Sequence, residues 1–380
     1  MVSSGDEDQA IGLICKNCFH QSLWLPQTAE HPRLRVTYST TTNFDNVSLS
    51  LPVILFIGPM FGSRWDALHF NKLANDSGVR AIFVDRPGFG GSTPVQLDVR
   101  VAIWLETVPV LLHRLGVEHV SLVTHSAGTI YTLNTLLRYR SILDPKAPYV
   151  AFLAPFVPKT HSGAAVPTLA AKLPVTALDS WAGLVKFVNS KILPGVAASG
   201  GLISPLSTMF SSPSPAGTDL PGGEAPNNST SLVEQYGFDD ATAKLVHKLA
   251  TKWQFAESNQ GGNEEAKLCL EKSDGTASWG EAADYSGCAR RIADNEAALS
   301  LNEGHAPPKL SVSAFFAGSD IMIAKRGQAF FEQCWQSDEV TGKVDFTTST
   351  YPEANHDSLL VDLKKGALKA VFEKVAHLNK

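Results

Sequence analysis

Three residues that together can carry out nucleophilic catalysis, a serine, an aspartate and a histidine, lie far apart in the chain. The serine is Ser126 in Thr124-His125-Ser126-Ala127-Gly128, which follows a β-branched apolar run and precedes a helical pattern. A strand that turns sharply into a helix exposes one side chain above a sheet if the residues two before and two after it are small. Thr124 and Gly128 occupy those places, although the usual residue at the first is glycine. The pentapeptide by itself fits either a nucleophile or a serine that caps a buried helix.

A serine hydroxyl that attacks near neutral pH needs a base for its proton and a carboxylate to orient that base. Asp320 follows a predicted strand, and His356 lies between the final predicted strand and the final predicted helix. Because ligand sites of parallel sheets gather at the carboxyl ends of the strands, we expect both side chains to converge on Ser126. We predict that His356 is the base and Asp320 its partner. Glu332 or Asp338 would replace Asp320 only if the strand assignment were wrong.

Other polar residues near these motifs fit structural roles better. His125 is predicted to point away from the reacting side of such a turn, and Asp357 fits a cap on the last helix. Residues 85–90 are expected to form a rigid turn that supports the site, in which Arg86 anchors carbonyls or carboxylates. Residues 160–163 contain a second serine motif, but no strand immediately precedes it.

The elements that must position these residues alternate between strand and helix. Continuous apolar runs are typical of strands that are buried on both faces, and apolar residues at three- and four-residue spacing indicate helices. This alternation predicts an α/β fold with a doubly wound, mostly parallel sheet that helices cover on both faces. We expect an opening antiparallel pair at 11–25 and 33–40, buried strands at 52–57, 79–84, 120–125, 149–153, 310–316 and 343–348, and helices at 65–75, 98–115, 127–140, 325–337 and 357–377.

The strand pattern stops between residues 156 and 305. We therefore divide the chain into a core domain of residues 1–155 and 306–380 and an inserted, mainly helical cap of residues 156–305. Within the cap, Gly, Ser, Pro and Ala dominate residues 195–231, a composition that predicts a flexible loop. Helices are expected in the cap at 177–192 and 239–255.

Composition excludes several classes of function. The 380 residues are 44% hydrophobic with a net charge of −5, and no long run of Lys and Arg interrupts them, so we expect a sizeable core and no nucleic-acid partner. No signal-peptide pattern or bilayer-length apolar stretch is seen, which predicts a cytoplasmic protein without a membrane span. Residues 15–18 have the Cys-x-x-Cys spacing of metal ligands without a second close pair. We expect two strand-borne core cysteines and no metal there.

Five short motifs recur where predicted strands end: Gly58-Pro59-Met60-Phe61-Gly62, Asp85-Arg86-Pro87-Gly88-Phe89-Gly90, His125-Ser126-Ala127-Gly128, Gly318-Ser319-Asp320 and Asn355-His356-Asp357. In this order they resemble the α/β-hydrolase family over residues 33–155 and 308–377. The resemblance implies that Ser126, Asp320 and His356 form a catalytic triad, that a cap is inserted after the sixth strand, and that no cofactor is needed. It further implies an oxyanion hole made by the backbone N–H groups of Ala127 and Met60.

The activity that the resemblance implies is hydrolysis of a carboxylic ester, thioester or lactone through an acyl-enzyme. The family's epoxide hydrolases and haloalkane dehalogenases carry aspartate at the turn, so Ser126 argues against those activities. Acyl transfer, carbon–carbon bond hydrolysis and a catalytically silent binding protein remain alternatives. The substrate is expected to be a small apolar or acyl-bearing molecule. Four aromatic residues of the cap either line its pocket or hold the cap together: Trp181, Phe187, Trp253 and Phe255.

Overall fold

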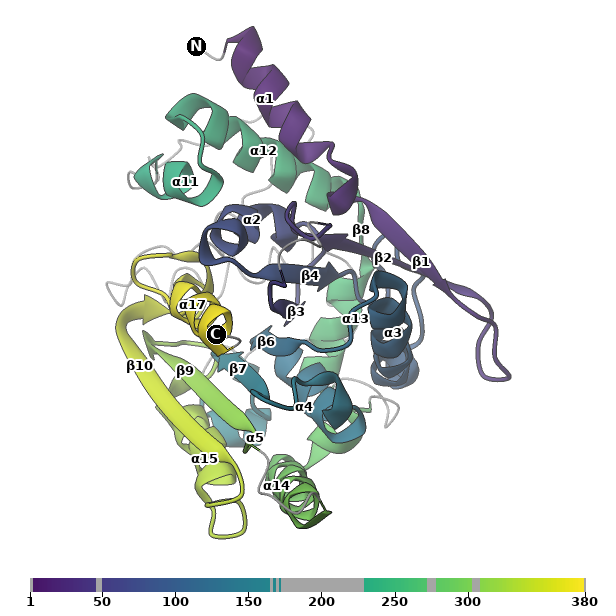
Figure 1. Ribbon diagram of the computed structural model, residues 1–380, viewed down its shortest axis with the longest axis vertical. Helices are drawn as coiled ribbons and strands as arrows, with labels where there is room; N and C mark the ends of the chain where they lie inside the picture. The colour runs from purple at the N-terminus through teal and green to yellow at the C-terminus, as the bar shows by residue number, and fades with distance from the viewer. Residues whose placement is uncertain are drawn as a thin grey trace.

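The computed structural model describes residues 3–45, 50–164, 167–168, 171, 229–271, 278–302 and 308–378. Its centre is an eight-stranded sheet (Figure 1). In sheet order the strands are β1 (Gln21–Leu25), β2 (Leu34–Thr40), β4 (Arg80–Val84), β3 (Val53–Ile57), β6 (Ser121–His125), β7 (Tyr149–Leu153), β9 (Ser311–Ser319) and β10 (Asp345–Asn355).

The sheet is mostly parallel. β1 pairs with β2, and β2 with β4, in antiparallel register, whereas every pair from β4 to β10 is parallel. The predicted doubly wound sheet is therefore confirmed. The helices of the core are α1 (Ser4–Ile14), α2 (Asp66–Ser77), α3 (Arg100–Leu115), α4 (Gly128–Arg138), α15 (Ala324–Gln336), α16 (Ser358–Val361) and α17 (Leu368–Leu378).

Consecutive side chains of the central strands pack on opposite faces of the sheet, because strand side chains alternate with a period of two. In β3, Ile54 and Phe56 join an apolar cluster with residues of α2 and α17. Leu55 and Ile57 join a second cluster with residues of α3, α4 and α15. Burial on both faces explains why these strands are continuous apolar runs in the sequence.

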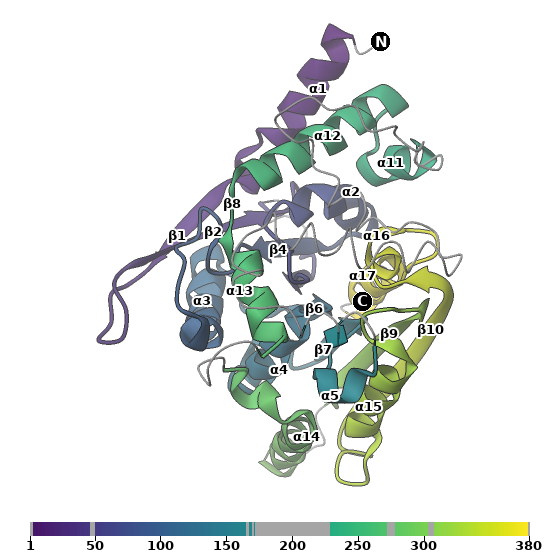
Figure 2. The same ribbon diagram turned by 180° about the vertical axis from the view of Figure 1, so that it is seen from behind.

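The inserted segment 156–305 is largely helical where the structure describes it. α12 packs against α1 and α11, and α14 against α4 and α15. Figure 2 shows α13 beside α3, on the side of the molecule that faces away from the viewer in Figure 1. The segment thus spreads over several parts of the core. Its helices are α5 (Lys159–Ser162), α11 (Ser229–Tyr236), α12 (Asp240–Ala256), α13 (Gln260–Cys269) and α14 (Tyr285–Asn302).

Two expectations for this segment fall partly or wholly beyond the described residues. The helix expected at 177–192 and residues 195–228 of the expected loop lie outside them. Residues 229–231 of that loop instead begin α11, which corrects the prediction at its end. The helix expected at 239–255 is present as α12.

The N-terminal prediction is wrong for residues 11–20. The chain begins with α1, whose N-cap Ser3 accepts a hydrogen bond from the Asp6 N–H and donates its own N–H to the Asp6 carboxylate. Cys15 is exposed at the end of this helix, and Cys18 is half-buried in a short 3-10 turn, so neither is a strand-borne core cysteine. Within the described part of the chain, no His, Cys, Asp and Glu group could hold a metal ion.

The C-terminal prediction is wrong in two details. β10 continues to Asn355, across a register shift after Tyr351, rather than ending at 348. The single helix expected at 357–377 is divided into α16 and α17, because the Asp362 carbonyl accepts the Gly366 N–H and closes a turn between them. A side chain at Gly366 would collide with three backbone carbonyls there.

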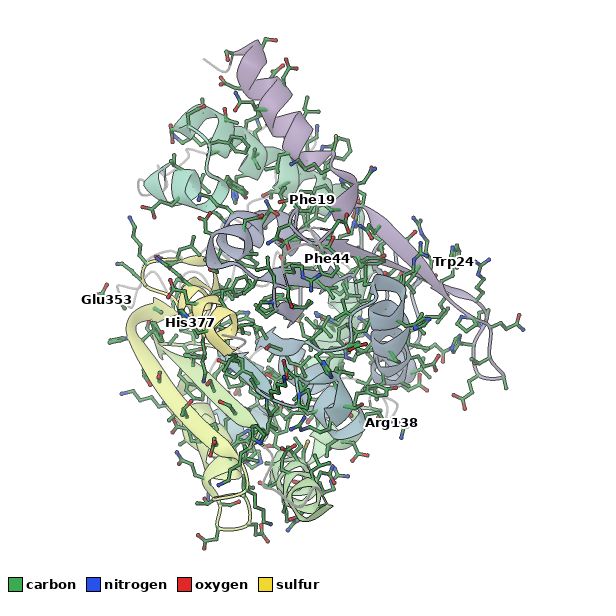
Figure 3. All side chains as sticks on the ribbon, in the orientation of Figure 1. Phe19, Trp24, Phe44, Arg138, Glu353 and His377 are labelled. Carbon is green, nitrogen blue, oxygen red and sulfur yellow. The ribbon has the colours of Figure 1, made fainter. Side chains whose placement is uncertain are left out.

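The surface of the protein carries both charged and aromatic side chains (Figure 3). Phe19 and Phe44 are buried, whereas Trp24 on β1 is 48% exposed and lies under the Arg33 guanidinium. None of the helices that the structure describes combines the length and apolar character needed to cross a bilayer.

Candidate active site

Ser126 lies at a sharp turn between β6 and α4. Its φ of 50° falls in the left-handed region that residues with a side chain seldom adopt. Hydrogen bonds on both sides hold this strained backbone: the Ser126 N–H donates to the Leu153 carbonyl, and the Ser126 carbonyl accepts from the Thr129 and Phe156 N–H groups. The surrounding structure thus fixes the serine at the carboxyl end of β6.

Thr124, the departure from the usual glycine, fits because its hydroxyl has a partner. The Thr124 Oγ1 donates to the Ile57 carbonyl at 3.0 Å, and the side chain is fully buried. The same crowding makes Gly128 necessary, since a Cβ there would collide with Thr124 Oγ1 and with the carbonyls of Ile57 and Gly58. Strand and helix can therefore approach closely with only one of the two positions occupied by glycine.

The structure brings Ser126, His356 and Asp320 together in one hydrogen-bonded chain. His356 Nε2 lies 2.9 Å from Ser126 Oγ, and His356 Nδ1 lies 2.8 Å from Asp320 Oδ2. The other carboxylate oxygen, Asp320 Oδ1, accepts the N–H groups of Met322 and Ile323, each at 2.8 Å. These bonds fix the direction of the carboxylate and, through it, the imidazole ring.

Asp320 and His356 shift each other's pKa values in opposite directions. Burial alone would raise the pKa of Asp320, but the charge and hydrogen bond of His356, together with the two backbone donors, lower it. Burial alone would lower the pKa of His356, but the Asp320 carboxylate raises it. The pair therefore favours an ionised carboxylate beside an imidazole that can accept a proton.

His125 supports the backbone of His356 rather than the hydroxyl of Ser126. Its Nε2 donates to the His356 carbonyl at 2.9 Å, and the centres of the two rings lie 4.9 Å apart. Burial lowers the pKa of His125 to about 3, so this ring stays neutral. Its contact fixes the segment between β10 and α16.

The residues expected as oxyanion-hole donors lie on two elements that meet beside Ser126. Ala127 is the N-cap residue of α4 and is buried. Met60 lies in the loop after β3, where the Pro59 carbonyl accepts the Gly62 N–H at 2.8 Å. Arg86 Nη1 also donates to the Gly58 carbonyl at 3.0 Å, and Arg86 Nη2 to the Pro59 carbonyl at 2.5 Å. The turn containing Arg86 thus contacts the loop directly.

Alternative acids do not contact the histidine. Glu332 accepts hydrogen bonds from Gln328 and Thr348, and Asp338 is exposed at the end of α15. Asp357 is the N-cap residue of α16, but its side chain makes no capping hydrogen bond. The expected cap is supplied instead by the Asn355 carboxamide oxygen, which accepts the N–H groups of residues 357 and 358.

Two of the four aromatic residues predicted either to line the pocket or to hold the cap together lie on α12. Trp253 is 48% exposed, with Lys252 Nζ 5.5 Å from its ring centre. Phe255 is half-buried on the same helix. Trp181 and Phe187 lie outside the described residues. Ser162, of the second serine motif, lies in α5, and its hydroxyl accepts the Ala164 N–H.

A buried carboxylate that the motifs do not reveal is Glu265 on α13. It pairs with Arg86 and Arg100 and accepts the Tyr131 hydroxyl. The one sequence signal is the preceding Gly261-Gly262 pair. A Cβ at either glycine would collide with an aromatic ring, that of Phe89 or Phe61 respectively, so these glycines let α13 approach the core.

Comparison with known proteins finds the same fold in solved structures. A mutant of esterase E22 has a similar fold, with a TM-score of 0.54 and 11% identity over 94% of this chain and 99% of that one. A structure from a study of carboxylesterases of Nitrososphaera gargenis has a TM-score of 0.50 and 11% identity over 94% and 99% of the two chains. An alpha/beta hydrolase fold protein from Nakamurella multipartita has a TM-score of 0.50 and 13% identity over 95% and 100%. No curated protein matches the sequence. The model of the Alpha/beta hydrolase family matches residues 54–257, more than half of the chain, so this protein belongs to the alpha/beta hydrolase family.

Proposed function

We propose that this protein is a serine hydrolase that cleaves a carboxylic ester, thioester or lactone through an acyl-enzyme on Ser126. The observation that carries the proposal is the hydrogen-bonded chain from Ser126 Oγ through His356 to Asp320. A hydroxyl, an imidazole and a buried carboxylate in this order are what acyl transfer by serine requires.

In the first half of the reaction, Ser126 Oγ attacks the carbonyl carbon while His356 Nε2 takes the hydroxyl proton. Asp320 accepts a hydrogen bond from the Nδ1–H of His356, which keeps the unprotonated Nε2 directed at Ser126 as the base and stabilises the imidazolium that forms. When the tetrahedral intermediate collapses, His356 gives its proton to the departing alcohol or thiol. The acyl group then remains on Ser126.

The negative oxygen of the tetrahedral intermediate needs hydrogen-bond donors that are already in place. We assign this role to the backbone N–H groups of Ala127 and Met60. Pro59 has no N–H to offer. The N-terminus of α4 adds the positive end of a helix dipole at the same point.

In the second half, water attacks the acyl carbon as His356 takes one of its protons. The proton then passes to Ser126 Oγ, the acyl–oxygen bond breaks, and a carboxylic acid leaves. We further propose that segment 156–305 covers this site as a cap. Its described helix α13 supports that role, because Glu265 on α13 pairs with the turn that contacts the loop of Met60.

A fluorophosphonate probe and a panel of acyl esters, thioesters and lactones of graded size test the proposal. We expect one equivalent of probe on Ser126, no labelling of Ser126→Ala, and turnover of at least one substrate class. Ser162→Ala is the matched control, since it removes the serine of the second motif and should label as the wild type does. Absence of both labelling and turnover across the panel would overturn the proposal.

A further inference from the structure

A single buried carboxylate, Glu265, joins the inserted segment to two elements of the site. Its side chain is fully buried, as are those of Arg86 and Arg100. Glu265 Oε1 accepts Arg86 Nε at 2.5 Å and Arg100 Nη2 at 3.2 Å, and Oε2 accepts Arg86 Nη2 at 2.7 Å. The first of these pairings is bidentate, which fixes the plane of the Arg86 guanidinium.

The adjacent edge of that guanidinium, formed by Nη1 and Nη2, holds the loop after β3. Arg86 donates to the carbonyls of Gly58 and Pro59, and the Pro59 carbonyl also accepts the Gly62 N–H. The Pro59 carbonyl and the Met60 N–H belong to one planar trans peptide unit, so they point in opposite directions. Fixing the carbonyl oxygen on Arg86 therefore fixes the direction of the Met60 N–H.

Glu265 also holds the helix that carries the second donor. The Tyr131 hydroxyl donates to Glu265 Oε1 at 3.0 Å. Tyr131 is fully buried in α4, one helical turn beyond Ala127, the N-cap residue of that helix. One carboxylate thus contacts both the side chain that fixes the Met60 peptide and the helix that begins at Ala127.

We propose that Glu265 is a positioning residue that sets the distance and direction between the two oxyanion-hole donors. This inference rests on the proposed function, since it assigns the donors that the hydrolytic reaction would use. Glu265 acts through Arg86 and Tyr131 and touches no reacting atom. Because hydrogen bonds to the oxyanion form fully only in the transition state, a shift of these donors lowers kcat more than it raises KM.

A neighbouring ion pair offers a matched control. Glu257 is half-buried at the end of α12 and pairs with Arg64, which in turn bonds Asp85. It also accepts the Trp65 indole N–H at 3.1 Å. This pair ties the inserted segment to the core as Glu265 does, but its bonds run to Arg64, Asp85 and Trp65, whereas the carbonyls of Gly58 and Pro59 are bonded by Arg86.

The experiment compares Glu265→Gln with Glu257→Gln. In Glu265→Gln an amide NH₂ replaces one acceptor and faces the donors of Arg86. We expect kcat to fall by about 10- to 100-fold with KM within about threefold, and the Ki of a trifluoromethyl ketone inhibitor, which forms a tetrahedral adduct, to rise by the same factor. Glu257→Gln should keep kcat and that Ki within about threefold, even if its melting temperature falls.

Two milder variants keep the test decisive if Glu265→Gln does not fold. Arg86→Lys keeps the charge but cannot bond both carbonyls and Glu265 together, and Tyr131→Phe removes one hydroxyl. Both variants should lower kcat and raise the Ki of the ketone inhibitor by similar factors. Unchanged kcat in all three variants, or equal loss in Glu257→Gln, would overturn the inference while wild-type turnover still supports the hydrolase. Absence of wild-type turnover and labelling would overturn the proposed function itself.

Discussion

Two of the buried polar clusters in the described part of the chain differ in what their protons can do. In the first, a hydroxyl, an imidazole and a carboxylate lie in series from Ser126 to Asp320. In the second, Glu265 is surrounded by the donors of Arg86, Arg100 and Tyr131. Both are screened from water, yet only the first contains a group whose charge changes near neutral pH.

Burial has a different effect on the charges of each cluster. Burial alone would lower the pKa of Arg86, but Glu265 raises it, so the arginine stays charged at every working pH. Burial raises the pKa of Tyr131, which therefore keeps its proton. The second cluster is thus a fixed set of charges that holds shape, whereas the imidazole of the first lets a proton move between partners.

The largest effect is expected from Ser126→Ala, which removes the only nucleophile of the first cluster. Turnover should fall by about 10⁴- to 10⁶-fold, while the melting temperature stays within a few degrees because the hydroxyl contributes little packing. Steady-state kinetics measures the turnover, and calorimetry on the same preparation measures the melting temperature. More than about a tenth of wild-type turnover would reject Ser126 as the nucleophile.

Met60→Pro removes a proposed donor and keeps every side chain of the two clusters. If the variant folds, kcat should fall by about 10²- to 10³-fold, because one backbone N–H is missing from the transition state. Met60→Leu keeps the N–H and should retain most of the activity. Near-normal kcat in folded Met60→Pro would move the second donor elsewhere in the loop after β3.

The pH profile separates the proton-carrying cluster from the fixed one. Since activity needs a neutral His356 and its pKa is raised above 6.5, kcat/KM should fall as the pH drops through a value above 6.5. Asp320→Asn removes the charge that raises this pKa, so burial then dominates and the acidic limb should move to lower pH. Glu265→Gln should leave the limb in place. A limb that does not move in Asp320→Asn would contradict the pairing.

The smallest effect concerns Asp66, a buried carboxyl near the fixed cluster whose pKa lies near neutrality. Burial raises its pKa from 3.8 to about 7, although the Ser63 N–H and the charge of Arg86 act against this. A carboxyl that holds its proton more tightly in the folded state makes the protein less stable as the pH rises from about 4 to 7. In Asp66→Asn the side chain does not titrate, so this loss of stability with rising pH is absent.

Melting temperatures at several pH values test this point. The Asp66→Asn protein should gain a few degrees over the wild type at pH 8 and much less at pH 4, where the wild-type carboxyl is protonated in the folded state and only partly ionised in the unfolded state. A difference that is the same at both pH values would show that Asp66 does not titrate as the structure indicates.

Much of the fold could be predicted because local sequence determines it. The buried strands are continuous apolar runs, and the motifs that follow β6, β9 and β10 lie at strand ends that a parallel sheet must bring to one edge. The positions of Ser126, Asp320 and His356 follow from this topology, without knowledge of any side-chain contact.

The rest depends on pairings between distant residues. Arg86 could be expected to anchor carbonyls or carboxylates, but no local pattern says that its partner lies on α13. The sequence does not indicate α1, because its apolar residues are few and its capping box of Ser3 and Asp6 lies ahead of the segment predicted as a strand.

The position of Glu265 restricts how this protein can be re-engineered. A chimera that receives residues 156–305 from a relative without an equivalent glutamate would leave Arg86 and Arg100 as two neighbouring cations without the carboxylate that now joins them. Uncompensated buried charge of this kind typically costs about 3–5 kcal/mol. A graft onto this protein therefore has to keep Arg86, Arg100 and Glu265 together. It also has to keep Gly261 and Gly262, which let α13 approach the core.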